Sequence, residues 1–343
     1  MNRGQLSDAL TDRTVLPKPL RDGPIDAMRA VSMLYIVGFW HLFDYARNKS
    51  FDHHDETTFR LTVLALGLFV FISGYLTARK DPAPSGQLDT VAYYKARFWR
   101  IYPPFLIATS LFLLLHIGSS YDLYKGITLV AMFAAPAPPT LWFVSMIVVF
   151  YVIAPLLVRL RTNVAGFLAL CLSLILAMML YQALTGHIDP RIILYFPCFA
   201  AGIFLGGRSL ITSPLALAGL VILAAMSLIP TIGRPAAAIE RDLMSAPWAL
   251  FGSVAIFMIV KRYGGAFTTV AIVNYLGVAS FWMYLLHRPI LKILVQEWFP
   301  ASGAGQLGYL VMVCLPIVAV AGRITQRAYD AILKKARRST APV

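Results

Sequence analysis

Charged residues are scarce in this sequence: they make up 13% of its 343 residues, whereas hydrophobic residues make up 59%. The mean hydropathy of +0.70 excludes an ordinary soluble globular domain. Apolar runs of about 17 to 22 residues recur along the chain, and each can cross a hydrocarbon layer of about 30 Å. Because no water in that layer can satisfy backbone groups, these runs must be helices. The sequence therefore predicts an all-α, polytopic membrane protein.

Cysteine is also rare, and its positions exclude further classes of protein. Cys171, Cys198 and Cys314 all fall inside apolar runs, at no spacing typical of metal ligands. We interpret them as small buried hydrophobes. The sequence has no glycine-rich phosphate loop and no serine-nucleophile elbow. Its first 24 residues are polar, so we expect no cleavable signal peptide.

Ten apolar segments are predicted to span the membrane, and we expect about ten transmembrane helices. The segments are 25–45, 62–78, 101–118, 141–158, 164–184, 191–207, 214–231, 244–260, 270–291 and 306–322. A further run, 126–135, is too short to cross, and we interpret it as re-entrant or interfacial. We expect one membrane domain over 25–323, between a polar tail (1–24) and a basic tail (324–343). Residues 323–338 alternate apolar and basic residues, which predicts an interfacial helix.

The distribution of Lys and Arg predicts the orientation of these spans. With the N-terminus in the cytoplasm, most of the 30 Lys and Arg residues lie on the cytoplasmic side. Counting 126–135 as an eleventh crossing would place the basic run 159–161 and the basic tail on opposite sides. We therefore expect both termini to be cytoplasmic. The net charge of +14 then faces anionic lipid, and we expect no nucleic-acid partner.

The stretch YYKARFWRIYPPF (93–105) interleaves cations with aromatic residues. Arg97 and Arg100 are three residues apart and share one helical face. Guanidinium groups bind phosphate in a bidentate manner, and neighbouring aromatic rings can stack on a purine. The stretch thus fits a phosphorylated cytosolic ligand, such as a nucleotide or coenzyme A. Snorkelling arginines in an interfacial aromatic belt are the alternative interpretation.

The first predicted span contains ionisable residues, which are costly inside a membrane and are candidates for function. Arg29 lies near its inner end and His41 near its outer end. Histidine is the natural general base near neutral pH, and Asp44, about one turn further, could orient it. A histidine that is hydrogen-bonded at the outer interface is the alternative.

Two other spans carry polar side chains on otherwise apolar helices. In the ninth, Ser280, Tyr284 and His287 follow the spacing i, i+4, i+7, which places them on one face. In the fourth, the polar positions are Trp142, Ser145 and Tyr151. Interhelical packing and an interfacial tryptophan could explain both sets without any catalytic role.

A possible metal site lies in the loop DHHDET (52–57). His53, His54 and Asp55 could supply ligands, but adjacent histidines in a flexible loop lack a fixed geometry. We therefore predict no metal site.

In their order along the chain, these pieces resemble the acyltransferase-3 family of bacterial integral-membrane O-acyltransferases, which decorate lipopolysaccharide, exopolysaccharide and similar glycans. The matching motifs are DAMRA leading to His41, FVFISGYL, RFWRIYPPF, LWFVS running on to FYVIAPLL, YFPCFAAGIFLG and SFWMYLLHRPIL. The resemblance covers roughly residues 22 to 323.

The resemblance implies transfer of an acyl group, usually acetyl, from coenzyme A to a hydroxyl of a glycan or lipid-linked glycan outside the cytoplasmic membrane. Acyl-coenzyme A would be a co-substrate, with no permanently bound cofactor. Arg29 and His41 match the essential arginine–histidine pair of the family. Arg97 and Arg100 match its cytoplasmic pair, which is linked to the acyl donor, with Trp99 and Tyr102 beside them. Trp142, Ser145, Tyr151 and His287 match further motif positions, and Asp44 and Tyr284 are candidates for the same substrate cavity.

Two departures from the family pattern have structural consequences. The family usually places ten residues between the arginine and the histidine, whereas eleven lie between Arg29 and His41. At about 100° per residue, the extra residue would turn His41 away, so we expect a π-bulge or kink between Ser32 and Trp40, at Gly38. The acidic residues that many members carry after the tryptophan–serine motif are also absent, and Ile147, Val148 and Val149 stand there.

Two other functions fit a polytopic membrane protein of a glycan pathway. A lipid-linked-glycan flippase would show basic residues along several spans rather than one arginine pair. A glycan polymerase usually has a long outer loop with arginines, whereas the longest outer loop predicted here has about 14 to 16 residues. We therefore expect a membrane O-acyltransferase.

Overall fold

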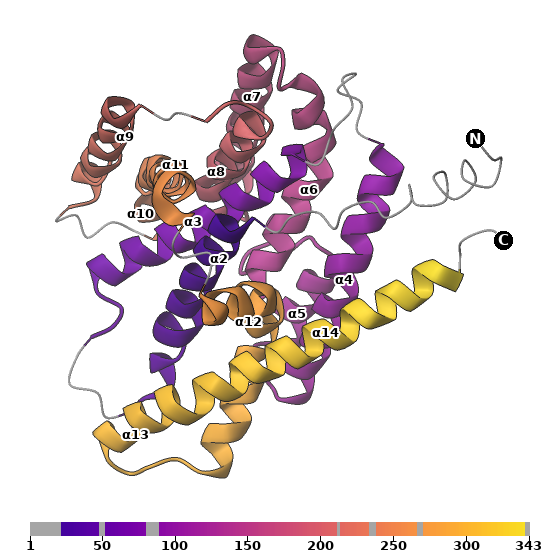
Figure 1. The fold of residues 1–343 in the computed structure, drawn as a ribbon, viewed down its shortest axis with the longest axis vertical. Helices are drawn as coiled ribbons and strands as arrows, with labels where there is room; N and C mark the ends of the chain where they lie inside the picture. The colour runs from indigo at the N-terminus through magenta and orange to yellow at the C-terminus, as the bar shows by residue number, and fades with distance from the viewer. Residues whose placement is uncertain are drawn as a thin grey trace, which may run out of the picture.

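The protein is described here by a computed structural model, which covers residues 22–47, 52–79, 89–210, 213–232, 238–265 and 270–339. Within these ranges the regular structure is entirely helical (Figure 1), which confirms the predicted all-α class. The α-helices are α2 (Gly23–Tyr35), α3 (Glu56–Arg79), α4 (Thr90–Leu114), α5 (Ser120–Ile127), α6 (Trp142–Leu160), α7 (Val164–Thr185), α8 (Arg191–Leu205), α9 (Pro214–Met226), α10 (Ala238–Met244), α11 (Ala246–Tyr263), α12 (Ala271–Glu297), α13 (Gly303–Tyr309) and α14 (Leu315–Ser339). Short π- and 3-10 segments are Ile36–Trp40, Phe43–Tyr45, Ile229–Thr231 and Leu310–Cys314.

Helices occupy all ten predicted spans. Seven helical segments of the described ranges are long and apolar enough to cross a membrane: Glu56–Arg79, Trp142–Leu160, Val164–Thr185, Pro214–Thr231, Glu240–Tyr263, Ala271–Glu297 and Gly303–Ala336. The other three predicted spans contain α2, which has 13 residues, α8, which has 15, and α4, whose first half carries three cations. The chain is a multi-pass membrane protein; the count of ten and the side of each terminus stay predictions.

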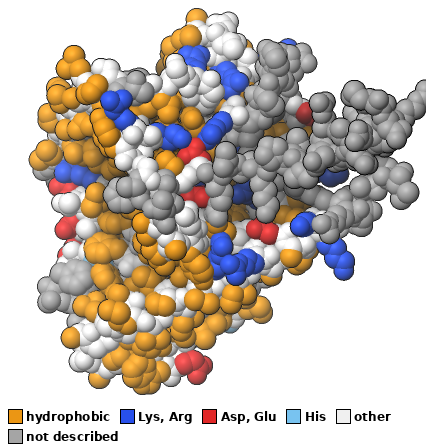
Figure 2. Space-filling view, in the orientation of Figure 1, with side chains coloured by type: hydrophobic (Ala, Val, Ile, Leu, Met, Phe, Trp, Pro, Cys, Tyr) orange, Lys and Arg blue, Asp and Glu red, His pale blue; other side chains and the backbone are white. Residues whose placement is uncertain are grey.

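The surface of the bundle is apolar, as contact with lipid requires. Figure 2 shows a face covered largely by hydrophobic side chains, with Lys and Arg in its upper and middle parts. Helix α7 is the clearest example, because Leu168, Leu172, Leu176 and Leu180 are each more than half exposed. A soluble protein could not expose such a stripe at this scale.

Helices α3 and α8 cross in close contact because glycine occupies the crossing point on both. A Cβ atom built on Gly202 would lie 2.1 Å from the carbonyl oxygen of Phe71, and one on Gly74 would lie 2.2 Å from that of Phe199. Small residues of this kind let helix backbones approach closely inside a membrane. The crossing fixes α3, which supplies one wall of the site described below.

Helix α12 packs on α2 through a similar contact. A Cβ atom on Gly277 would lie 2.7 Å from the carbonyl oxygen of Asp26. Arg29, about one turn after Asp26, donates a hydrogen bond from Nη2 to Oγ of Ser280 at 3.0 Å. The polar stripe of α12 therefore faces α2, as its spacing predicted.

Helix α2 continues as a π-helix over Ile36–Trp40. The amide of His41 donates to the carbonyl oxygen of Ile36 at 3.0 Å, a bond that spans five residues instead of four. Gly38 lies at the centre of this segment, and a Cβ atom there would lie 3.1 Å from Cδ2 of Leu315. The predicted π-bulge is confirmed, and it absorbs the extra residue between Arg29 and His41.

Asp22 joins three helices at the end of the bundle where α2 begins. It accepts a hydrogen bond from Nζ of Lys261 at 2.9 Å and is paired with Arg79. Burial raises the pKa of Asp22, but the hydrogen bonds from Lys261 and Arg79 outweigh this effect and hold the pKa below its usual value.

The run 126–135 forms no crossing helix, as predicted. Helix α5 ends at Ile127, and irregular backbone follows. Buried Lys125 satisfies two carbonyl groups of this irregular backbone, because its Nζ donates to the oxygens of Ala134 (2.9 Å) and Pro136 (2.7 Å). The helix expected over 323–338 is present as the continuous end of α14, and its position at a membrane interface stays a prediction.

Candidate functional site

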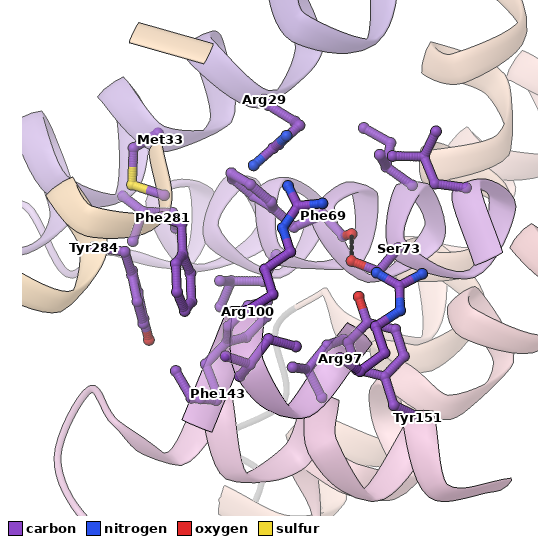
Figure 3. A pocket seen from close by; sticks show the side chains of 17 residues that line it. Arg29, Met33, Phe69, Ser73, Arg97, Arg100, Phe143, Tyr151, Phe281 and Tyr284 are labelled. Carbon is purple, nitrogen blue, oxygen red and sulfur yellow. Dashed lines mark hydrogen bonds between the residues drawn. The ribbon is translucent and has the colours of Figure 1, made fainter. Parts of the chain in front are cut away.

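A cavity of about 130 Å³ lies between α2, α3, α4, α6 and α12, and three arginines line it. These are Arg29 from α2 and Arg97 and Arg100 from α4, residues that the sequence placed in two separate motifs. Figure 3 shows the guanidinium group of Arg100 extending toward Arg29, with Arg97 beside Tyr151. None of the described residues that line this space is acidic. We call it the arginine cavity; its chemistry favours an anionic ligand.

The three arginines are held to different degrees. Arg97 donates from Nη2 to Oγ1 of Thr77 at 3.0 Å and lies over the ring of Tyr151, 4.5 Å from its centroid. Arg29 is hydrogen-bonded to Ser280. The side chain of Arg100 makes no hydrogen bond or ion pair with the part of the chain that the structure describes. Its five N–H donors are therefore available to a ligand.

At the other end of α2, His41 meets His287 of α12. Nδ1 of His41 lies 3.2 Å from Nε2 of His287, and the ring centroids are 5.0 Å apart. Nδ1 of His287 lies 2.7 Å from the carbonyl oxygen of Tyr284, one turn earlier. His287 is fully buried, whereas His41 also reaches a second cavity.

These distances fix the tautomer of His287 when both imidazoles are neutral, and they allow two tautomers of His41. A carbonyl oxygen only accepts, so Nδ1 of His287 carries the proton and its Nε2 is an acceptor. Nδ1 of His41 can donate to that acceptor, and Nε2 of His41 then keeps a free lone pair. In the other tautomer, Nδ1 of His41 accepts from Nη2 of Arg288. Nη2 of Arg288 lies 3.3 Å from Nδ1 of His41 and contributes positive charge beside it. In the first tautomer, Nε2 of His41 is the ring nitrogen that can accept a proton.

The second cavity has a volume of about 440 Å³ and contains His41 in its wall. We call it the histidine cavity. Its polar lining comes from elements far apart in the sequence: Asp189, Arg191, Arg241 and Asp242. An aromatic platform adjoins them, because Trp142 and Tyr195 are stacked at 6.2 Å and both line the cavity.

The carboxylate of Asp189 is tied to the guanidinium group of Arg191, with Nε 2.7 Å from Oδ1. Arg191 also lies over the ring of Trp142, 4.0 Å from its centroid. Carboxylates and guanidinium groups can bind hydroxyls, while aromatic faces offer apolar contact. This combination suits a polyhydroxylated ligand.

The two cavities share three lining residues: Ile36, Leu66 and Tyr284. They come from the π-segment, α3 and α12, so each of these three elements borders both cavities. Tyr284 is fixed in place because its hydroxyl donates to the carbonyl oxygen of Thr140.

Asp44 differs from its predicted position beside His41. It contacts Nε2 of His53 at 3.2 Å, Nε2 of His54 at 3.1 Å and Nη2 of Arg288 at 3.4 Å. The reason is local: the α-helix has ended, and the 3-10 turn Phe43–Tyr45 directs the carboxylate toward the next connection. The residues that contact Nδ1 of His41 are His287 and Arg288.

Tyr102 and Trp99 also differ from their predicted positions around the donor. The Tyr102 hydroxyl donates to the carbonyl oxygen of Ile127 at 3.0 Å, and its ring lines a neighbouring cavity of about 540 Å³ that shares Arg97 and Tyr151 with the arginine cavity. Trp99 is half exposed and lines none of these three cavities. Trp99 directly precedes Arg100 and Tyr102 follows it by two positions, so their side chains leave α4 about 100° and about 160° away from that of Arg100.

The other predicted residues divide between the two cavities. Tyr151 lines the arginine cavity, Trp142 the histidine cavity and Tyr284 both. Ser145 is fully buried, and its Oγ has no hydrogen-bond partner among the described residues. It lines neither cavity.

Several cavity residues were not predicted. Asp189 and Arg191 are charged residues at the start of an apolar span, and this position could have marked them as candidates. Arg288 directly follows the candidate His287 and could have been found in the same way. Arg241 and Asp242 belong to the short helix α10, which has no distinguishing pattern.

Comparison with known proteins identifies the family of this chain. Residues 23–322 match the model of the acyltransferase-3 family, which is described as an acyltransferase domain. No curated protein and no solved structure gave a significant match. Since the family model covers most of the chain, the protein is a member of the acyltransferase-3 family.

Proposed function

We propose that this protein transfers an acyl group, acetyl in the first instance, from acyl-coenzyme A to a hydroxyl of a glycan or lipid-linked glycan. The donor enters the arginine cavity from the cytoplasm, and the acceptor enters the histidine cavity from outside the bacterial cytoplasmic membrane. Both termini are then cytoplasmic, as the distribution of Lys and Arg predicts.

The single observation that carries this proposal is that two unlike cavities share three lining residues, Ile36, Leu66 and Tyr284. One is lined by three arginines and no described acid; the other is lined by His41, carboxylates and stacked aromatic rings. Arg29 and His41 are separated by about 18 Å of helix rise, a large part of the bilayer core. A phosphate-bearing donor and a hydroxyl-bearing acceptor can therefore approach from opposite ends.

The reaction needs a base for the acceptor hydroxyl. Nε2 of His41 takes its proton while the oxygen attacks the carbonyl carbon of the thioester, so that a C–O bond forms. The C–S bond then breaks, and the thiolate of coenzyme A takes the proton from His41. A base with a lone pair near neutral pH is what attack by an alcohol requires. His287 holds the His41 tautomer that makes this possible.

The test separates donor binding from transfer. Purified protein in detergent is titrated with acetyl-coenzyme A, and acylation of envelope glycans is measured by mass spectrometry in a deletion strain that carries each variant. We expect the double variant Arg97→Ala, Arg100→Ala to lose donor affinity by about ten- to hundredfold for each charged hydrogen bond removed. His41→Ala should bind the donor normally and transfer nothing.

Lys95→Ala is the matched control, because Lys95 is an exposed cation on α4 that does not line the arginine cavity. It should bind and transfer like the wild type. Unchanged binding in the double arginine variant would mean that the pair only anchors the protein in the membrane. Glycan acylation by His41→Ala would refute the role of His41 as the base.

A further inference from the structure

The connection between α2 and α3 brings together three side chains that can bind a metal ion. They lie at the same end of the bundle as His41. Asp44, His53 and His54 each offer one donor atom, and these atoms all lie within 4.8 Å of one another. Both imidazole Nε2 atoms approach the same oxygen, Oδ1 of Asp44, at 3.2 and 3.1 Å. The rings of the two histidines are 4.0 Å apart at a tilt of 30°.

The two distances from Asp44 to the histidines match edges of a tetrahedral metal site. With ligand bonds of about 2.0 to 2.1 Å, neighbouring ligand atoms around zinc lie about 3.3 Å apart. Two imidazoles and one carboxylate form a donor set that suits Zn²⁺ and related transition ions, whereas Ca²⁺ and Mg²⁺ prefer oxygen alone. Ligation requires each histidine to carry its proton on Nδ1, so that the Nε2 lone pair is free.

The three side chains are also held in position by neighbours. Arg288 contacts the other oxygen of Asp44, Oδ2, at 3.4 Å, which leaves Oδ1 facing the histidines. The carbonyl oxygen of His53 accepts from Oγ1 of Thr58 at 2.8 Å, and the amide of His54 donates to Oδ1 of Asp52 at 2.9 Å. These contacts hold the carboxylate of Asp44 and the backbone that carries the two histidines. Neighbouring groups orient the ligands of metal sites in the same way.

The ring of His53 is buried, and its exposed fraction is 2%. Phe39 and Phe43 lie edge-on to it, with ring centroids at 6.4 and 6.2 Å. His54, in contrast, has a side chain that is 44% exposed. One side of the cluster is thus fixed in an apolar pocket, while the other is open to an entering ion.

We propose that Asp44, His53 and His54 bind a divalent transition-metal ion, Zn²⁺ being the best match. Three protein ligands leave a fourth position for water. The ion would fasten the start of α3 to the end of the first span. Arg288 connects this site to the base, because its Nη2 lies 3.4 Å from Asp44 and 3.3 Å from Nδ1 of His41. The proposal goes beyond acyl transfer and does not depend on it.

The experiment uses the full chain in detergent, purified without a histidine tag and stripped with a chelator. Zn²⁺ is titrated by calorimetry, and the melting temperature is followed in parallel. We expect one ion per chain and a melting temperature that rises with Zn²⁺, as for any ligand of the folded state, but not with Mg²⁺ or Ca²⁺. His54→Ala and Asp44→Asn should each weaken Zn²⁺ binding by more than about tenfold.

His54→Ala is the decisive variant, because an exposed side chain can be truncated without loss of the fold. His187→Ala is its control, since His187 is an exposed histidine in the connection between α7 and α8. It should keep the affinity of the wild type. Absence of Zn²⁺ binding by the wild type, or equal affinity in His54→Ala, would show that the cluster is only a pair of hydrogen bonds to Asp44.

Discussion

Nδ1 of His41 lies 3.2 Å from Nε2 of His287, and this contact joins the first helix of the bundle to the long helix α12. His287 is in turn fixed by the carbonyl oxygen of Tyr284. The chain of contacts resembles the way in which a third group orients the base of many hydrolases, although here that group is an imidazole. In the proposed mechanism, its function is to keep the lone pair of His41 on Nε2.

The first prediction concerns this orienting role. His287→Ala removes the acceptor for the Nδ1 proton of His41, so the wrong tautomer becomes populated and turnover should fall. A general base contributes about 10²- to 10⁴-fold, and we expect the variant to lose a large part of that factor. The KM for acyl-coenzyme A should stay unchanged, because the arginine cavity is untouched.

His287→Gln provides the control, since its amide oxygen can accept the same proton and should restore part of the turnover. Steady-state kinetics on reconstituted protein and the melting temperature give the two readouts. Equal loss of turnover in both variants, together with lower melting temperatures, would indicate a role in packing only.

Arg97 and Arg100 should differ when each is changed alone. Arg100 has no partner within the described structure, so Arg100→Ala should reduce donor affinity and leave the melting temperature unchanged. Arg97 is bonded to Thr77 and lies over Tyr151. Arg97→Ala should therefore lower the free energy of unfolding by about 0.5 to 2 kcal/mol, through loss of the cation–π contact, and should also lower donor affinity. Lys95→Ala again controls for the loss of one positive charge.

Calorimetric titration with acetyl-coenzyme A and thermal melting of the same samples would distinguish the two arginines. If both single variants melt at the wild-type temperature, the contacts of Arg97 do not stabilise the fold. If neither changes donor affinity, the arginine cavity is not the donor site.

The glycine contact between α3 and α8 gives a prediction about stability. Gly202→Ala places a Cβ atom 2.1 Å from the carbonyl oxygen of Phe71, so the helices must move apart. Overpacking of this kind costs about 1 to 3 kcal/mol. Gly219→Ala on α9 is the control, because no atom lies within 4 Å of the added Cβ. The melting temperature should fall for the first variant only, and equal values for both would contradict the close crossing.

Local patterns in the sequence were sufficient for the helices and for several contacts between them. The spacing of Ser280, Tyr284 and His287 predicted a shared face, and the structure places that face against α2. The eleven-residue interval before His41 predicted a π-segment, because only a local widening can absorb one residue in a helix.

Contacts between distant segments could not be read in the same way. Asp189 and Arg191 line the histidine cavity because the tertiary fold brings the start of α8 close to His41. No periodicity in the sequence relates these residues to His41. Asp44 was predicted to act one turn beyond His41, but a 3-10 turn follows the π-segment and redirects it. His53 and His54 lacked a third ligand in the loop itself, which is why no metal site was predicted; the candidate third ligand, Asp44, comes from the end of the first span.

The π-segment gives the last prediction. Deleting Val37 shortens Ile36–Trp40 by one residue, so the bond from the His41 amide can span four residues as in an ordinary α-helix. The direction of His41 relative to Arg29 is then preserved, and we expect the variant to insert and to keep measurable transfer. Deleting Val37 and Gly38 together should turn His41 by about 100° away from His287 and abolish transfer.

Both deletions leave the arginine cavity in place apart from its wall at Ile36, so acetyl-coenzyme A should still bind to each. Donor titration therefore distinguishes a misplaced base from a protein that has not folded. Equal glycan acylation by the one- and two-residue deletions would mean that the direction of His41 does not matter, and His41 could not then be the base. Transfer that survives only in the single deletion would show that the widened turn exists to place the imidazole against His287.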